Sequence, residues 1–218
     1  MDSIYWQKRW KRGEIGWHQD RINSHLAEHW PRLGLADGAQ VFVPLCGKAR
    51  DLLWLAAQRY RVLGVEVSAL AVDAFINENQ LRAQRIQEGA FQRVVADEIT
   101  LLIGDFFALE PEHLEGVSAV YDRASLIALP PDRRRAYSNK LEGLLDSGTL
   151  SLLITVDYDQ DRMNGPPFAV SDHEVRGLFA TEFRIEHLAD HDVLAKEPHW
   201  RQRGLDALTE RVYLMTRR

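Results

Sequence analysis

The sequence predicts an α/β fold with a mostly parallel sheet of seven strands, helices on both faces and an antiparallel pair of strands at one edge. Short β-branched runs alternate with longer stretches of helical period, which is typical of βαβ units. The runs VLGVE, LLIG and LSLLITV are almost continuously apolar, as expected of strands covered on both faces. FRIEHLAD and ERVYLMT instead alternate, and no obvious helix separates them, so they are expected to form the antiparallel pair.

The elements follow one another without a linker, repeat or low-complexity tract, so we expect one domain over residues 1–218. Strands are expected near 41–44, 62–66, 99–104, 117–122, 149–156, 183–189 and 210–216. Helices are expected near 22–30, 49–58, 69–79, 131–145 and 172–179. Residues 1–37 contain no predicted strand but carry four tryptophans, which either pack on the sheet or form a cap over a ligand site.

Composition excludes several classes of protein. With 218 residues, 45% of them hydrophobic, and a formal net charge of -5, the chain is typical of a soluble globular protein. No Lys/Arg-rich stripe indicates a nucleic-acid partner, and the cluster Arg133–Arg135 is interpreted as a solvated helix face. No signal-peptide run or membrane span is visible, and the single cysteine favours a reducing compartment. We expect a cytoplasmic protein, by default a monomer, that binds a small molecule.

The turn Pro44–Lys48 lies between the first predicted strand and the helix that follows it, where backbone N–H groups and the helix dipole favour an anion. A P-loop is excluded because Val43 stands in the place of its first glycine and Ala49 follows Lys48. A dinucleotide fingerprint is also excluded, because the turn has only Gly47. The turn therefore suits a carboxylate better than a pyrophosphate.

Two further strands end on residues that suit a nucleoside. Glu66 closes RVLGVE at the place where a carboxylate grips ribose hydroxyls, although it can equally cap the helix that opens with Ser68. LLIGDFF places Asp105 and Phe106 after another central strand, where Phe106 offers an apolar face to adenine and Asp105 can accept from its exocyclic amine. A phenylalanine in this position is also common in a core.

The fourth predicted strand ends at Asp122, and Arg123 follows at the point where the strand order is expected to reverse. An arginine there can pair with a ligand carboxylate in fork geometry, or with a neighbouring aspartate. Both interpretations stay open on the residues alone.

Three motifs are not interpreted as sites. Cys46 has no base near it in sequence, so we expect a small buried thiol. His25 and His29 have i, i+4 spacing but no third ligand in sequence, so we expect a solvent-facing pair and no metal. The segment DYDQDRMNG has Arg162 where a calcium loop needs glycine and Phe168 where it needs glutamate.

Taken together, PLCGK with DLLWLA, GVEVS, YDRASLIAL, GPPFAV and the N-terminal YWQKRW and GWH resemble the thiopurine S-methyltransferase family from about Tyr5 to Met215. The resemblance implies the Rossmann-like class I methyltransferase fold, with residues 1–37 as a cap over the cofactor site. It also implies S-adenosyl-L-methionine as the cofactor and methyl transfer to the sulfur of thiopurines or related small aromatic thiols, with selenium or tellurium species as further acceptors.

Carried over residue by residue, the resemblance implies one set of cofactor contacts and one set of acceptor contacts. The cofactor set is Trp10, Leu45, Glu66, Asp105, Phe106 and Arg123, with Asp105 and Phe106 beside adenine. The acceptor set is Trp17, Arg123, Pro167 and Phe168. Trp17 stands where the family usually has phenylalanine, which leaves the acceptor range open. No general base is assigned, since Asp122 either serves as one or orients Arg123.

Other functions remain open at this stage. One is a methyltransferase acting on another small-molecule acceptor. A nicotinamide oxidoreductase would use Glu66 in the same way but would not explain the turn Pro44–Lys48. A non-catalytic nucleoside-binding module would share the strand-end residues and lack the reaction.

Overall fold

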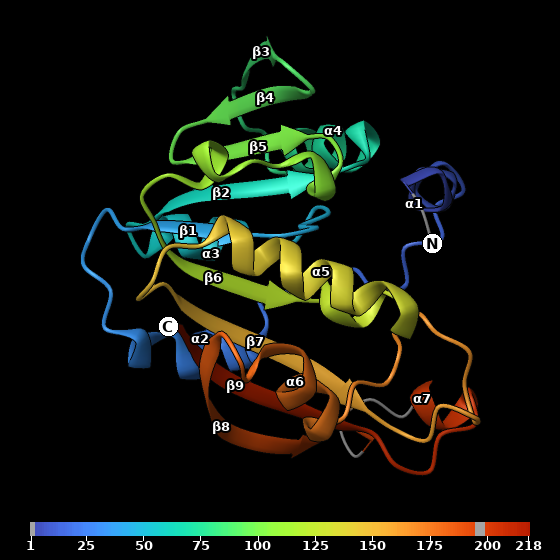
Figure 1. Cartoon of the computed structure of the whole chain (residues 1–218). Coiled ribbons are helices and arrows are strands. Elements are labelled where there is room, and N and C mark those ends of the chain that lie inside the picture. Colours follow the sequence, from blue (N-terminus) through green and yellow to red (C-terminus); the bar gives the residue numbers. More distant parts are fainter. Residues whose placement is uncertain (1–2, 195–198) are drawn as a thin grey trace. The chain divides into compact units, whose positions relative to one another are not determined.

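The computed structural model describes residues 3–194 and 199–218, and the chain divides into two compact units, residues 1–121 (unit 1) and 122–218 (unit 2) (Figure 1). The prediction of a single domain with a cap over residues 1–37 stays a prediction. No helix in the described residues is long and apolar enough to cross a membrane.

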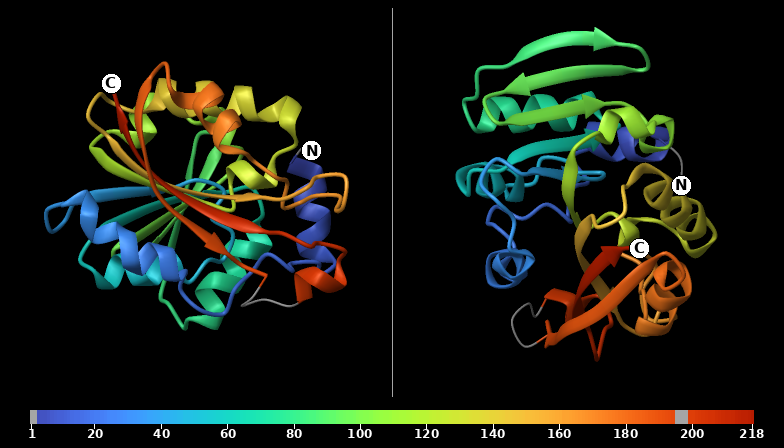
Figure 2. Two further views of the ribbon diagram at one scale, coloured as in Figure 1. Left: turned by 90° about the horizontal axis from the view of Figure 1, so that it is seen from below. Right: turned by 60° about the vertical axis from the view of Figure 1, so that its left-hand side comes forward.

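Unit 1 contains a mixed sheet in the order β3-β4-β5-β2-β1-β6. Its strands are β1 (Gln40–Val43), β2 (Arg61–Glu66), β3 (Gln84–Glu88), β4 (Phe91–Ala96), β5 (Ile99–Ile103) and β6 (Val117–Arg123). The central strands β5, β2, β1 and β6 are parallel, whereas β4 is antiparallel to β5 and β3 to β4. Figure 2 shows β3 and β4 extending the sheet beyond β5. Because parallel strands share one direction, the segments that follow β1, β2 and β5 meet at one edge.

Helices and short turns complete unit 1. The α-helices are α1 (Ser3–Lys11), α2 (Ser24–His29), α3 (Asp51–Ala57) and α4 (Ala69–Glu78), and the 3₁₀ segments are η1 (Trp30–Leu33), η2 (Phe106–Ala108) and η3 (Pro111–Leu114). Helix α4 buries Ala71, Val72, Phe75 and Ile76, which share one helical face. Both α3 and α4 contact β2 and β5.

Unit 2 is built on three antiparallel strands in the order β7-β9-β8. They are β7 (Leu150–Asp157), β8 (Phe183–Asp192) and β9 (Thr209–Arg217), accompanied by η4 (Leu126–Ala128), α5 (Pro131–Leu144), α6 (Asp172–Phe179) and α7 (His199–Gln202). The predicted antiparallel pairing of the last two strands is confirmed. The register shifts between His187 and Ala189, where a bulge interrupts β8.

The described residues contain nine strands rather than the predicted seven. The two additional strands form the β3–β4 hairpin. All five residues of β3 are exposed, and its sequence QRIQE lacks the apolar alternation that would have indicated a strand. The expectation of a solvated arginine face on α5 is wrong for Arg134, which is 1% exposed and pairs with Glu174 of α6 at 2.6 Å. Its neighbour Arg135 donates to the carbonyl oxygens of Gly177 and Leu178.

Candidate functional site

Backbone hydrogen bonds join the three segments that carry the predicted cofactor residues of unit 1. The Cys46 N–H donates to the Val65 carbonyl over 3.0 Å, and the Gly104 N–H donates to the Glu66 carbonyl over 3.0 Å. The turn after β1, the end of β2 and the turn after β5 therefore lie side by side. This places Leu45, Glu66 and the Asp105 segment at one edge of the sheet.

The turn Pro44–Lys48 has an unusual backbone. Leu45 has φ 46° and Gly47 has φ 55°, so two residues of this turn are left-handed. A leucine in this region is uncommon and costs about 1–2 kcal/mol, whereas glycine adopts it freely. Strained backbone of this kind clusters at ligand sites, where the surrounding structure holds it in place.

Glu66 fastens the turn to the start of α4. Its Oε2 accepts from the Gly47 N–H over 2.9 Å, and its Oε1 accepts from the Ser68 N–H over 2.8 Å. The side chain is buried, and this burial raises the pKa of Glu66 to about 7, although the backbone donors of Ser68, Gly47 and Val67 oppose the shift. The capping role considered from the sequence is thus present in the structure. A carboxylate has about four lone-pair sites, so beside these three backbone donors one remains that can accept from a ribose hydroxyl.

Cys46 and Lys48 have structural roles in the same turn. A Cβ added to Gly64 would lie 2.8 Å from the Cys46 sulfur, so the thiol packs directly on a strand glycine. Burial raises the pKa of Cys46 well above its usual value, which agrees with the expected inert thiol. Lys48 Nζ pairs with Glu78 of α4 at 2.7 Å, so its charge is already matched by a carboxylate.

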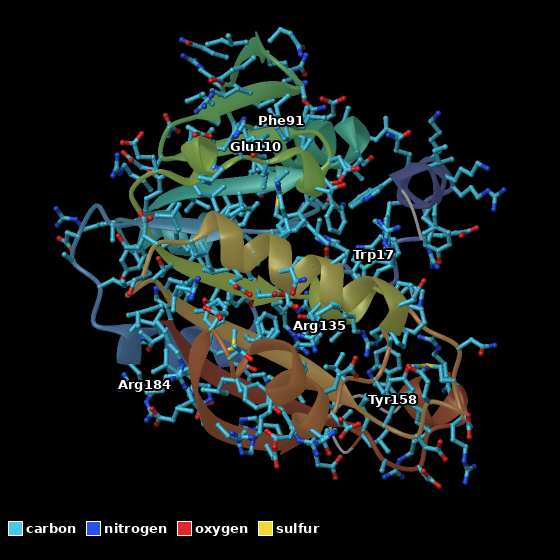
Figure 3. The ribbon with its side chains drawn as sticks, in the orientation of Figure 1. Trp17, Phe91, Glu110, Arg135, Tyr158 and Arg184 are labelled. Carbon is cyan, nitrogen blue, oxygen red and sulfur yellow. The ribbon has the colours of Figure 1, made fainter. Side chains whose placement is uncertain are left out.

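A cluster of aromatic rings from the N-terminal segment includes both predicted tryptophans. The Trp10 and Trp17 rings meet edge to face with centroids 6.0 Å apart, and Trp6 contacts Trp17 in the same way at 5.2 Å. The Arg9 guanidinium lies over the Trp17 ring at 5.0 Å. Figure 3 shows Trp17 beside α1. The Trp10 ring also approaches the turn, because a Cβ on Gly47 would lie 3.4 Å from Trp10 Cζ2.

Asp105 and Phe106 occupy different environments although they are adjacent. Asp105 is exposed, and its Oδ1 accepts from the Phe107 N–H over 2.9 Å, which caps η2. Phe106 is 2% exposed and packs edge to face on Phe107. The structure thus gives Phe106 the core position that the sequence left open, while the Asp105 carboxylate reaches solvent.

In unit 2, Asp122 and Arg123 diverge at the end of β6. Asp122 is buried, and it accepts from the Tyr137 hydroxyl over 2.7 Å and from the Leu126 N–H over 3.4 Å. Burial raises the pKa of Asp122 to about 6. Arg123 is half-buried and has no ion pair within residues 122–194 and 199–218. Asp122 therefore braces the turn through Tyr137 instead of neutralising its neighbour.

The GPPF loop of unit 2 is held by a hydrogen-bond network. The Phe168 N–H donates to the Ile127 carbonyl over 2.7 Å, which joins the loop to the segment after Arg123. Tyr158, labelled in Figure 3, donates its hydroxyl to the Pro167 carbonyl over 2.5 Å. The Arg134 guanidinium lies over the Phe168 ring at 6.0 Å. Pro167 and Phe168 are half-buried, so part of each remains accessible to a ligand.

Sequence analysis missed the residues that support this loop. Gln160 donates to the Met163 carbonyl over 2.7 Å and to the Tyr158 hydroxyl over 3.1 Å, and its Oε1 accepts from the Ala169 N–H over 2.9 Å. Tyr158 and Gln160 belong to the segment DYDQDRMNG, whose sequence indicates only a failed match to a calcium loop. Tyr158 and Gln160 lie six or more residues before Pro166 in the sequence, and nothing in the sequence pattern indicates that they contact the loop.

The expectation that the two histidines face solvent is wrong. His25 is 5% exposed and His29 is 6% exposed, so neither faces solvent. The cause is the position of α2, whose start is fixed by Asn23: the Asn23 N–H donates to Asp51 Oδ1 over 2.8 Å. The third potential ligand that the sequence analysis did not find is Glu28, on the same helical turn.

Comparison with known proteins agrees with this arrangement. The family described as thiopurine S-methyltransferase matches residues 1–218. A protein named thiopurine S-methyltransferase from Nitrosospira multiformis is 50% identical over 218 residues, which cover 100% of this chain and 99% of that protein. Another of the same name, from Azotobacter vinelandii, is 48% identical over 218 residues, which cover 100% of both chains. Such identity over the full length leaves the family in no doubt.

Solved structures with low sequence identity show the fold. An S-adenosylmethionine-dependent methyltransferase from Anabaena variabilis has a TM-score of 0.67 at 16% identity, covering 99% of this chain and 95% of that one. The 1,6-didemethyltoxoflavin-N1-methyltransferase of Burkholderia thailandensis, solved with S-adenosylhomocysteine, has a TM-score of 0.65 at 15% identity, covering 99% and 86%. The predicted class I methyltransferase fold is confirmed, and the chain belongs to the thiopurine S-methyltransferase family.

Proposed function

We propose that this protein transfers the methyl group of S-adenosyl-L-methionine to the sulfur of thiopurines or related small aromatic thiols. The observation that carries the proposal is the match of the whole chain, residues 1–218, to the thiopurine S-methyltransferase family. The turn Pro44–Lys48 and the Glu66 carboxylate supply the physical support within unit 1. Reduced selenium and tellurium species are proposed as further acceptors, because selenide and telluride anions are soft nucleophiles like a thiolate.

The residues at the strand ends of unit 1 fit this cofactor. The left-handed turn with one glycine suits a carboxylate, and the remaining lone pair of Glu66 suits a ribose hydroxyl. Asp105 offers an exposed carboxylate to an exocyclic amine. Trp10 lies against Gly47 and supplies an aromatic face, which attracts a cation such as a sulfonium. We therefore assign cofactor binding in unit 1 to Trp10, Leu45, Glu66 and Asp105, and propose that the buried Phe106 supports Asp105 from the core.

In unit 2 we assign Arg123, Pro167 and Phe168 to ligand binding. Among the described residues of unit 2, the half-buried Arg123 guanidinium has no carboxylate partner, and we propose that it pairs with a cofactor carboxylate or an acceptor thiolate. Pro167 and Phe168 present apolar surface that suits an aromatic acceptor. Trp17 of unit 1 is assigned to the acceptor as well, since Arg9 and Trp6 fix its ring.

The sulfonium of S-adenosyl-L-methionine, when bound, supplies an activated methyl group. The protein then has to orient the acceptor sulfur in line with the methyl carbon and exclude water, which together contribute about 7–11 kcal/mol when the geometry is good. Aromatic thiols ionise readily, and a cation such as Arg123 favours the thiolate further. No general base is therefore assigned. Asp122 is committed to Tyr137 and Leu126 and has the role of holding the turn that carries Arg123.

We further propose that the protein works in the cytoplasm as a monomer, with a small-molecule acceptor and no nucleic-acid or membrane partner. The single cysteine, which is buried, supports a reducing compartment. Gel filtration combined with light scattering would test the oligomeric state, and a mass twice that of the chain would overturn this part of the proposal.

Calorimetry tests the cofactor, and an acceptor panel tests the reaction. S-adenosyl-L-methionine is expected to bind with one molecule per chain, whereas NAD is expected not to bind. A panel of aromatic thiols, selenide and telluride with radiolabelled S-adenosyl-L-methionine then identifies acceptors. Cofactor binding without methylation of any acceptor would favour the non-catalytic nucleoside-binding module, and binding of NAD alone would favour an oxidoreductase.

A further inference from the structure

Helix α2 gathers two histidines and a glutamate on one helical turn of unit 1. The segment His25-Leu26-Ala27-Glu28-His29 places the two imidazoles at i, i+4, with ring centroids 6.3 Å apart and ring planes at 26°. One ligand atom from each of His25, Glu28 and His29 lies within 4.8 Å of the others. The Glu28 Oε1 is 3.8 Å from His29 Nε2. Small rotamer changes would bring these atoms to the separations found around a bound metal ion.

The backbone that carries these residues is held in place without an ion. Asn23 caps α2, because its side chain accepts from the N–H groups of His25 and Leu26. The Asn23 N–H in turn donates to Asp51 Oδ1, and Asp51 Oδ2 accepts from the Tyr121 hydroxyl over 3.0 Å. A buried carboxylate thus links the start of α2 to α3 and β6. An ion would find the helix already formed, which lowers the entropic cost of binding.

The end of α2 is held as firmly as its start. Trp30 follows His29 directly, is 2% exposed, and meets the rings of Tyr60 and Tyr121 edge to face at 6.1 Å. The histidine rings lie in the interior next to this anchor, whereas the Glu28 side chain is 60% exposed. The exposed carboxylate gives an ion a route from solvent to the two imidazoles.

We propose that His25, Glu28 and His29 form a binding site for a divalent transition-metal ion of the zinc class, separate from methyl transfer. Two imidazole nitrogens and one carboxylate oxygen are a donor set that suits Zn²⁺, with a fourth position for water or another group. Mg²⁺ and Ca²⁺ are disfavoured, because they prefer oxygen ligands in larger number. The ion stabilises the folded chain, since it binds the native arrangement of α2 and not the unfolded chain.

Metal titration of the untagged, chelator-treated full-length protein tests this site. Calorimetry with Zn²⁺ is expected to show one ion per chain, and Co²⁺ is expected to give the visible absorption of a tetrahedral nitrogen and oxygen site. At a free Zn²⁺ concentration a hundred times the dissociation constant, the unfolding midpoint is expected to rise by roughly 5–10 °C. Absence of binding, or binding with no rise in the midpoint, would overturn the proposal.

Variants locate the ion. Glu28→Gln keeps the size of an exposed side chain, so it leaves the fold intact. It is expected to weaken Zn²⁺ binding roughly tenfold or more, because even the mutation of residues that only hydrogen-bond to metal ligands causes a loss of that size. His29→Gln is expected to weaken binding further, with circular dichroism as the check on its fold. His173→Gln, at an exposed histidine of α6, is the control and should bind like the parent protein. Unchanged affinity in Glu28→Gln, or a loss in His173→Gln, would contradict the assignment.

Discussion

The Gly47 N–H donates to Glu66 Oε2 over 2.9 Å, so the strained turn Pro44–Lys48 is hydrogen-bonded directly to the buried Glu66 carboxylate. Glu66 also accepts from Ser68, which connects the turn after β1 to the first residues of α4. The same carboxylate that is proposed to bind ribose therefore also maintains the shape of the turn proposed to bind the methionine carboxylate. Changes at Glu66 should affect stability and cofactor affinity together.

Replacing Glu66 by glutamine should weaken both properties. Glutamine keeps one acceptor oxygen and places an NH₂ group against the N–H of Gly47 or Ser68. At pH 8 we expect the free energy of unfolding to fall by about 1–3 kcal/mol and the affinity for S-adenosyl-L-methionine to fall roughly tenfold or more. Urea unfolding and calorimetry measure the two effects. The control Glu78→Gln breaks only the ion pair with Lys48, so it should change little, and a cofactor affinity in Glu66→Gln equal to that of the parent would refute the ribose assignment.

Alanine variants of two glycines with the same backbone conformation distinguish the effect of backbone strain from an effect on cofactor binding. Gly47 has φ 55° and Gly89 has φ 56°, but a Cβ on Gly47 meets Trp10 whereas one on Gly89 meets nothing within 4 Å. Alanine at either position should cost about 1 kcal/mol of unfolding free energy. Only Gly47→Ala should also weaken S-adenosyl-L-methionine binding, by roughly threefold or more. Equal cofactor affinities of the two variants, measured by calorimetry, would argue against Trp10 and this turn as a binding element.

Arg123→Ala tests the proposed role of the Arg123 guanidinium in ligand binding. Loss of a charge-assisted contact should weaken binding of the cofactor or the acceptor by roughly tenfold or more. Arg184→Ala is the matched control, because Arg184 is an exposed arginine on β8 in the same unit, labelled in Figure 3. If Arg123→Ala binds both ligands and turns over like Arg184→Ala, the role of Arg123 is structural at most.

Tyr158→Phe tests the support of the GPPF loop. The change removes the hydroxyl that donates to the Pro167 carbonyl and accepts from Gln160, so the loop should become less ordered. We expect the KM for the thiol acceptor to rise by roughly threefold to tenfold, with the dissociation constant for S-adenosyl-L-methionine unchanged. Tyr60→Phe, at a half-buried tyrosine that packs on Trp30, serves as the control in steady-state kinetics. A KM that stays at the parent value would show that the loop does not contact the acceptor.

The buried Asp122 predicts a pH effect on stability. Its pKa is raised from 3.8 to about 6 by burial, so between these values the folded chain binds more protons than the unfolded chain. The contribution of Asp122 to the free energy of unfolding therefore decreases as the pH rises through this window. Asp122→Asn removes that dependence. The free energy of unfolding of the variant minus that of the parent should therefore be about 1–3 kcal/mol larger at a pH of about 6 than at pH 3.8.

Urea unfolding at a series of pH values measures this difference. Asp132→Asn, at an exposed position at the start of α5, should leave the pH profile of the parent unchanged. A constant difference between Asp122→Asn and the parent across the window would mean that Asp122 titrates at its ordinary pKa.

The elements around the proposed cofactor site were predictable because they rest on local signals. Apolar runs indicated β2, β5 and β7, and the turn with one glycine separated this chain from phosphate-binding loops. The strand pattern placed Glu66 at the end of a central strand, where parallel strands of a sheet present ligand-binding residues, but its hydrogen bond to the Gly47 N–H was not predicted. These inferences needed no knowledge of distant contacts.

Other features depended on tertiary contacts that a sequence pattern does not contain. Arg134 looked like part of a solvated cluster, and only the packing of α5 on α6 buries it against Glu174. His25 and His29 looked solvent-facing, because the anchor of α2 is Asp51, far along the chain. The hairpin strand β3 is stabilised by pairing with β4 and has no apolar face of its own.

Methyl transfer to a matched pair of acceptors tests the central claim most directly. The protein is incubated with labelled S-adenosyl-L-methionine and either 6-mercaptopurine or hypoxanthine, which carries oxygen where 6-mercaptopurine carries sulfur. We predict one labelled methyl group on the sulfur of 6-mercaptopurine, identified by mass spectrometry, and none on hypoxanthine. Cofactor binding with no methylation of 6-mercaptopurine, or equal methylation of both purines, would contradict an S-methyltransferase.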